Sequence, residues 1–385
     1  MSSVKRVFSL AAAFAAALNG TMVMPLIVLA LTRIPGIDEG AATAIAAAEL
    51  AGIALYCLLL PRLVQRARRL TKGFGLLALI VGELATQQFD SIAWLVAARL
   101  LAGLGEGALF SLVSAGVAAE ANAERIWGQI NLVGGLAMGL MLYGLSMLPP
   151  ATDRGPIFFW LAAMGFLMAP GVLSLQPKAA EPTASSVAPL KALQKGQIWT
   201  VVALVYGVQA AQWAVSGYLG EMAQLPGPRV GLYLSLSSIV GFVGAVVPSL
   251  SRDPKRRLQF VLQGFTVMAL ALLLFFNMLN DAAFLTGQIG VNIGFYMVTP
   301  FVTGLLTESD RDGSLVLRTL VVALTGATVG TALAGELYTR MGPWPFSVVC
   351  IVIVALGMGA AWRVFRHLTP ADIPASLRQV QAPKP

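Results

Sequence analysis

Long apolar stretches alternate with short polar breaks along the whole chain. A helix that crosses about 30 Å of hydrocarbon needs about 20 mostly apolar residues. Several breaks carry residues typical of turns, such as Pro35-Gly36 and Asn280-Asp281. The pattern predicts an all-α integral membrane protein with twelve transmembrane helices, at residues 7–31, 41–61, 72–89, 92–118, 125–148, 156–175, 197–220, 230–250, 258–279, 282–306, 314–339 and 343–365.

The longest polar stretch follows the sixth of these helices and predicts a division into two halves. It reads QPKAAEPTASSVAPLKALQKGQ and is rich in Pro, Ala and Ser, as flexible linkers often are. The expected units are an N-terminal six-helix bundle (1–175), a cytoplasmic linker (176–196), a C-terminal six-helix bundle (197–366) and a cytoplasmic tail (367–385).

Composition excludes a water-soluble protein. Of the 385 residues, 57% are hydrophobic and only 11% are charged, against about 25% charged in an average soluble domain. Too few charges are present to build a polar shell. We therefore expect contact with a lipid bilayer.

The positions of the Lys and Arg residues predict the orientation, because cytoplasmic loops carry most of the positive charge. With the N-terminus inside, 21 of the 26 Lys and Arg residues fall on the cytoplasmic side, four fall on the other side, and Arg99 lies within the membrane. We expect a multi-pass protein of an inner or plasma membrane with both termini in the cytoplasm. Topology thus accounts for the net charge of +8, and nothing points to nucleic acid.

The two halves can be superposed in sequence at an offset of 187 residues. Pro61 then matches Pro248 and Arg69 matches Arg256, both after the second helix of a half. Glycines of the fourth helices match as well. Repeated six-helix halves with a solute site near the membrane midplane are typical of one large transporter class.

The loop after the second helix resembles the signature loop of the major facilitator superfamily, Gly-x-Leu-x-Asp-Arg-x-Gly-Arg-Lys. Here the sequence is Pro61-Arg-Leu-Val-Gln-Arg-Ala-Arg-Arg-Leu70, with glutamine in place of the acid. In the family that acid forms part of a cytoplasmic gate. The resemblance therefore implies a gating role, with an altered latch, for Arg62, Gln65, Arg66 and Arg69.

The fourth helix carries a second likeness, Arg99-Leu-Leu-Ala-Gly-Leu-Gly-Glu-Gly107. It resembles the family's Arg-x-x-x-Gly-x-Gly motif, whose arginine is linked to proton coupling. Asn19-Gly20 with Pro25 in the first helix is a third, weaker likeness to the family. The fifth helix has Gly134-Gly135 but lacks the Gly-Pro pair of drug–proton antiporters, which counts modestly against an antiporter.

Four ionisable residues are candidates for positions deep in the membrane, where each charge costs about 2.5–3.5 kcal/mol by insertion scales. They are the candidate proton-coupling residues Glu49, Glu83, Arg99 and Glu106. Arg99 and Glu106 share a helix face but are about 10 Å apart along the axis, whereas Glu83 lies at a depth similar to that of Arg99. A structural ion pair and a proton-carrying site are both compatible with this pattern.

Polar and aromatic side chains of three helices predict a substrate pocket. A site with few polar groups and aromatic walls suits a small amphipathic or aromatic organic molecule, although interhelical hydrogen bonding is the plain alternative. The candidates are Asn19, Tyr206, Gln209, Gln212, Trp213, Gln288, Asn292 and Tyr296.

Other kinds of chemistry lack support in the sequence. The single histidine, His367, lies in the tail, and no nucleotide-binding Gly-x-x-x-x-Gly-Lys loop occurs. We expect no cofactor, no metal and no enzymatic activity. The sequence predicts a monomeric secondary transporter that moves a small organic solute by alternating access, with proton coupling. A proton-driven efflux antiporter, a lipid flippase and a membrane enzyme are the alternatives.

Overall fold

The computed structural model describes residues 3–59, 68–118, 123–148, 156–175, 190, 192–241, 243–245, 254–278, 280–308 and 314–366. These residues form long helices joined by short connections. The helices of the first half are α1 (Ser3–Ala17), α2 (Asn19–Leu31), α3 (Glu39–Leu59), α5 (Arg68–Gln88), α6 (Ile92–Ala118), α7 (Ala123–Ser146) and α8 (Ile157–Ser174). Those of the second half are α9 (Ala192–Met222), α10 (Gly227–Gly241), α12 (Pro254–Asn277), α13 (Asp281–Glu308), α14 (Ser314–Met341) and α15 (Pro343–Arg366).

Each predicted apolar stretch corresponds to helix in the described structure. Ten of the described segments are long and apolar enough to cross a membrane by length and composition. Two helices fall short of that standard: α5 begins with charged residues, and only Val133–Ser146 of α7 is strongly apolar. Large apolar side chains such as Phe166 and Leu140 are more than two-thirds exposed, as expected of a surface that faces lipid.

The first predicted helix is interrupted, which the apolar pattern did not predict. Leu18 leaves the helical conformation (φ −121°, ψ 16°) between α1 and α2. A second difference concerns the predicted linker, because α9 begins at Ala192 rather than near residue 197. The part of the predicted linker from 192 to 196 is therefore helical.

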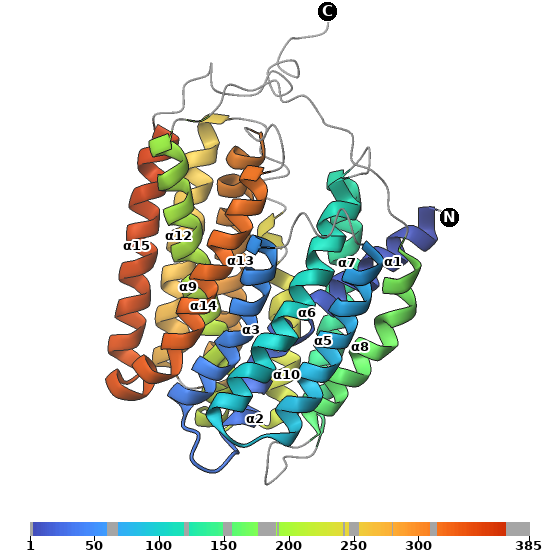
Figure 1. Ribbon diagram of the computed structural model, residues 1–385. Helices are drawn as coiled ribbons and strands as arrows, with labels where there is room; N and C mark the ends of the chain where they lie inside the picture. The colour runs from blue at the N-terminus through green and yellow to red at the C-terminus, as the bar shows by residue number, and fades with distance from the viewer. Residues whose placement is uncertain are drawn as a thin grey trace, which may run out of the picture.

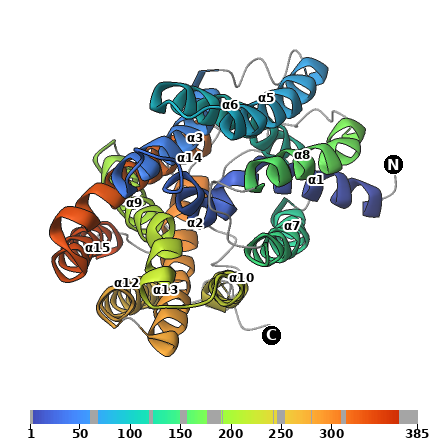
Figure 2. The same ribbon diagram turned by 90° about the horizontal axis from the view of Figure 1, so that it is seen from below.

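The helices form two bundles that stand side by side (Figure 1). Seen along the helices, α3 lies against α14 and α7 lies against α10, so these two pairs form the seams between the halves (Figure 2). Between the seams, α2 contacts α9. The fold is thus a pair of six-helix bundles in which one half of the broken first helix sits at the interface.

Glycines bring α3 and α6 into backbone contact. A Cβ atom at Gly103 would lie 1.9 Å from the carbonyl oxygen of Glu49, and one at Gly107 would lie 2.9 Å from that of Ile53. Only residues without a side chain allow this approach, which is how small residues act in membrane helix pairs. The crossing places Glu49 next to the turn of α6 that carries Glu106.

Contacts between the halves gather at the end of the bundles where α2 ends and α3 begins, here called the distal end. Arg33 pairs there with Glu221. The amide of Gly335 in α14 donates to the Thr43 hydroxyl of α3 over 3.1 Å. Nearer the middle, the Ser235 hydroxyl of α10 donates to the Gly139 carbonyl of α7 over 2.8 Å. The two halves are therefore closed against each other at the distal end.

Candidate functional site

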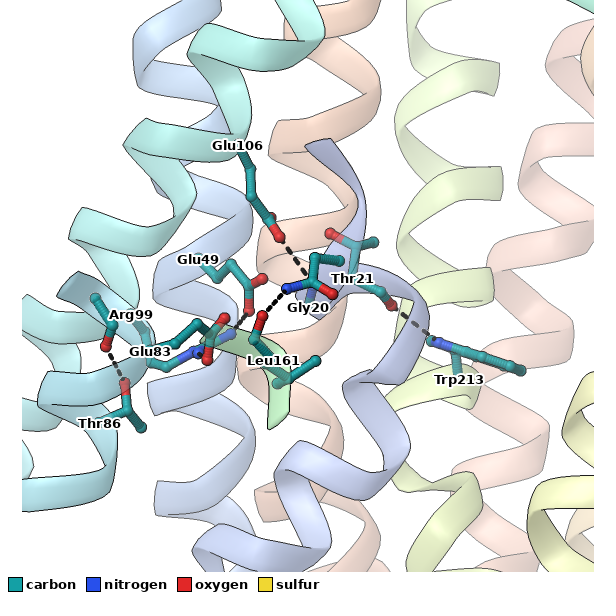
Figure 3. A network of polar contacts seen from close by, with 11 residues as sticks. Gly20, Thr21, Glu49, Glu83, Thr86, Arg99, Glu106, Leu161 and Trp213 are labelled. Carbon is teal, nitrogen blue, oxygen red and sulfur yellow. Dashed lines mark hydrogen bonds and ion pairs between the residues drawn. The ribbon is translucent and has the colours of Figure 1, made fainter. Parts of the chain in front are cut away.

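Arg99 is the centre of a fully buried ion cluster inside the first half (Figure 3). Its Nη1 atom lies 2.7 Å from Glu83 Oε2, and its Nη2 atom contacts Glu49 Oε2. The guanidinium carbon also lies 5.6 Å from the centre of the Phe158 ring, on a fourth helix. One cation thus holds two carboxylates away from water, the arrangement in which charge-assisted hydrogen bonds are strongest.

Three helices position this cluster, and each contributes one charged residue. Glu49 lies midway along α3, Glu83 near the end of α5, and Arg99 in the third turn of α6. Opposite chain directions bring Glu83 and Arg99 to a similar depth, as expected from the sequence, and their side chains form an ion pair. The contact with Glu49 was not predicted.

Glu106 bonds to the break in the first helix instead of to Arg99. Its Oε1 atom accepts a 2.8 Å hydrogen bond from the Gly20 amide. The first amides of a helix have no partner within that helix, and α2 begins at Asn19, so the break supplies a free donor to the carboxyl group. Gly20 was missed as a site residue, although Asn19-Gly20 within an apolar run was a usable signal.

The predicted polar residues of the second half form one amide cluster. Gln209 Nε2 donates to Asn292 Oδ1 over 2.8 Å, and Gln212 Nε2 donates to Gln288 Oε1. Asn292 Nδ2 donates in turn to Ser237 of α10, a residue that the sequence prediction missed, over 3.3 Å. Three helices, α9, α10 and α13, therefore meet at hydrogen-bonding side chains.

This cluster keeps unused hydrogen-bonding capacity. The buried oxygens of Gln209 and Gln212 and the buried amide nitrogen of Gln288 have no partner within the protein. Such groups cost free energy when they stay unpaired. These unpaired atoms all belong to side chains of α9 and α13.

Two predicted aromatic residues border the amide cluster. The rings of Tyr206 and Phe295 meet edge to face with centroids 5.0 Å apart, and those of Phe295 and Tyr296 are 5.3 Å apart. Tyr296 follows Asn292 by one helical turn. The combination of amides and aromatic walls matches the composition expected of an organic-solute site.

Trp213 and Asn19 make different contacts from the rest of the predicted pocket. The Trp213 indole nitrogen donates to the backbone carbonyl of Thr21 over 3.2 Å, which joins the second half to the broken helix. Asn19 donates to the Leu161 carbonyl of α8 over 2.9 Å. Trp213 therefore bridges the two halves, whereas Asn19 ties α2 to its own bundle.

The predicted gating residues are only partly visible in the structure. Arg62, Gln65 and Arg66 lie outside the described residues, and Arg69 is exposed in the first turn of α5. Within the described ranges, no three His, Cys, Asp or Glu side chains are grouped so as to hold a metal ion.

Removing the cation should show how strongly the cluster depends on it. We predict that Arg99→Leu lowers the free energy of unfolding by about 3–5 kcal/mol, because Glu49 and Glu83 lose the guanidinium that pairs with them. Arg229→Leu, which breaks a half-exposed pair with Asp281, should cost about 0–1 kcal/mol. Thermal unfolding of both purified variants in detergent measures the difference, and equal losses would contradict the assigned role of Arg99.

An all-helical fold of two six-helix bundles, with charged and polar residues gathered inside it, defines a membrane transporter. Residues 9–314 match the profile of the Major Facilitator Superfamily, and the chain belongs to this family. It is therefore assigned to membrane transport rather than to catalysis.

Solved structures of similar fold are transporters too. An auto-inhibited peptide transporter of the POT family has a TM-score of 0.66 at 13% identity, over 96% of this chain and 98% of that one. The human organic anion transporter MFSD10 (TETRAN) has a TM-score of 0.63 at 14% identity, over 94% of this chain and 100% of that one. A sequence search of curated proteins finds no match.

Proposed function

We propose that this protein is a proton-coupled secondary transporter of a small organic solute. One observation carries the proposal: the buried Glu49, Glu83, Arg99 and Glu106 adjoin a break in a helix that lies between the halves. Ionisable residues inside a membrane segment are expensive, and they commonly mark proton relays. Broken helices often mark the solute and ion sites of transporters.

The division of charge between the halves supports separate sites for proton and solute. All four mid-membrane ionisable residues named above belong to the first half. In the described helices of the second half, Lys, Arg, Asp and Glu stay near the helix ends. The amide cluster there offers neutral donors and acceptors, so the proposed solute binds to it through uncharged polar groups.

Alternating access would link the two sites. The halves rock about the midplane, and the distal closure described above is one of the two end states. With both termini in the cytoplasm, this state opens inward. The Trp213–Thr21 bond supports this link, because it joins the second half to the broken helix.

A proton-driven exporter is the main alternative with the same fold. An exporter would use the same buried charged residues and the same amide cluster. Only the direction of the solute flux relative to the proton gradient would differ. A lipid flippase is less favoured because the buried polar groups lie between helices of the second half.

Proteoliposomes test this function. A thermal-shift screen of small organic acids, amines and amphipathic drugs first identifies a ligand, which should no longer stabilise Gln212→Leu. With that ligand, an imposed pH gradient should drive uphill flux, and the sign of the flux separates import from export. Gln88→Leu, at the exposed end of α5, is the matched control. Flux that ignores the pH gradient would refute proton coupling.

A further inference from the structure

A count of charges shows that the buried cluster must hold a proton. Glu49, Glu83, Arg99 and Glu106 all have no exposed surface. Three carboxylates against one guanidinium would leave two uncompensated negative charges in a site without solvent contact. Each uncompensated buried charge costs several kcal/mol, so at least one carboxyl group carries hydrogen. One proton leaves a single net negative charge in the cluster, toward which the Gly20 amide donates.

The hydrogen-bond partners of the three carboxyl groups indicate which of them can carry this proton. Arg99 occupies one oxygen of Glu49 and one of Glu83, while the Gly20 amide occupies one oxygen of Glu106. The second oxygen of each carboxyl group has no assigned partner. Of these groups, Glu49 and Glu106 meet at Gly20: its amide lies 2.8 Å from Glu106 Oε1, and a Cβ atom there would lie 1.8 Å from Glu49 Oε1. Two ionised carboxylates cannot bond, since neither has a donor.

The helices packed around the pair carry other ionisable side chains. Phe158 and Leu161 of α8 contribute a ring and a carbonyl oxygen. The described part of α14 carries no ionisable side chain between residues 319 and 335. Helices α1, α3, α5, α9 and α14 carry further ionisable groups, which are Lys5, Arg6, Glu39, Tyr56, Cys57, Arg68, Arg69, Lys72, Lys195, Tyr206, Tyr218, Glu221, Arg318, Glu336, Tyr338 and Arg340.

Gly20 fits tightly between the members of this cluster. A Cβ atom there would lie 1.8 Å from Glu49 Oε1 and 2.7 Å from Arg99 Nη2. The same residue donates its amide hydrogen to Glu106. The next residue, Thr21, accepts the Trp213 bond from the other half. The break in the first helix therefore contacts the acids directly and the second half one residue later.

We propose that Glu49 and Glu106 share a single proton, and that the broken segment Leu18–Thr21 transmits its release to the second half. The inference rests on the proposed proton coupling and specifies its site. When alternating access admits water to the pair, the carboxyl O–H bond breaks, the proton passes to that water and both groups become carboxylates. Their repulsion displaces the Gly20 amide from its present position and so strains the Trp213–Thr21 bond.

Infrared spectroscopy of the purified full-length protein tests the shared proton without any transport assay. At neutral pH, exposed carboxyl groups are ionised. The wild type should therefore show one protonated-carboxyl C=O band that shifts in heavy water and disappears at high pH. Glu49→Gln and Glu106→Gln should each remove this band, whereas Glu83→Gln should keep it.

Several results would overturn the inference. They are the absence of the band in the wild type, its loss in Glu83→Gln, or its survival in both of the other variants. If the variants do not fold, the absence of the band in the wild type still refutes the inference. A band that behaves as described, combined with flux that ignores pH, would refute the proposed function and leave the shared proton intact.

Gly20→Ala tests the transmission step separately. Its methyl group should push Glu49 away from the break, so the band should remain while the response of solute flux to a pH gradient falls at least tenfold. Gly73→Ala, where a Cβ atom meets nothing within 4 Å, should behave like the wild type. An unchanged response in Gly20→Ala would overturn transmission through this segment.

Discussion

Replacing Glu106 by glutamine should abolish solute accumulation while leaving solute binding and exchange. The amide oxygen of glutamine can still accept the Gly20 amide hydrogen, so the variant resembles the protonated state permanently. One proton moving through 100 mV supplies about 2.3 kcal/mol, enough for roughly fiftyfold accumulation. In wild-type proteoliposomes, the ratio of internal to external solute can therefore reach roughly fifty. In Glu106→Gln proteoliposomes, this ratio should fall to about one.

The matched control is Asp281→Asn, which changes a half-exposed carboxylate paired with Arg229 within the second half. It should keep gradient-driven accumulation. Counterflow of labelled solute, which needs no gradient, should persist in both variants. Accumulation at the wild-type rate in Glu106→Gln would show that the coupling site lies elsewhere.

Gly335→Ala should impair closure of the distal end. A Cβ atom there would lie 2.1 Å from the Glu39 carbonyl oxygen and 2.7 Å from the Thr43 hydroxyl. Overpacking of this kind costs about 1–3 kcal/mol, equivalent to roughly a 5- to 150-fold change in the population of the closed state. Transport should fall by a similar factor, since every cycle passes through this state.

The labelling rate of a single introduced cysteine measures closure of the distal end directly. Ser146 is buried beside Gly231 at the seam of α7 and α10. Ser146→Cys, in a background without Cys57 and Cys350, should react faster with an impermeant maleimide when Gly335→Ala is added. Gly144→Ala, at the same end with open space around it, is the control. An unchanged labelling rate would contradict the role of Gly335.

Apolar length predicted the helices well because spanning a bilayer constrains each segment separately. Backbone groups in lipid must bond within their own helix, so residues 92–118 could be delimited from sequence alone. The break at Leu18 escaped this reasoning. It is compensated by the tertiary contacts of Glu106 and Trp213, which no local pattern encodes.

The sequence predicted which residues belong to the candidate site, but it did not predict most of the contacts between them. Chain direction and depth sufficed to pair Glu83 with Arg99. The approach of Glu49 depends on how closely α3 and α6 cross at Gly103, a quantity that helical periodicity leaves open. Likewise, periodicity placed Gln209 and Asn292 each on a stripe of its own helix, but it did not give the hydrogen bond between them or the partner of Asn19.

Proton movement driven by the solute is the most direct test of the central claim. Proteoliposomes with equal pH on both sides and a pH-sensitive dye inside should receive a solute gradient alone. Coupling is reciprocal, so the wild type should change the internal pH, and Glu106→Gln should pass solute without changing it. Solute flux through the wild type with constant internal pH would contradict the account.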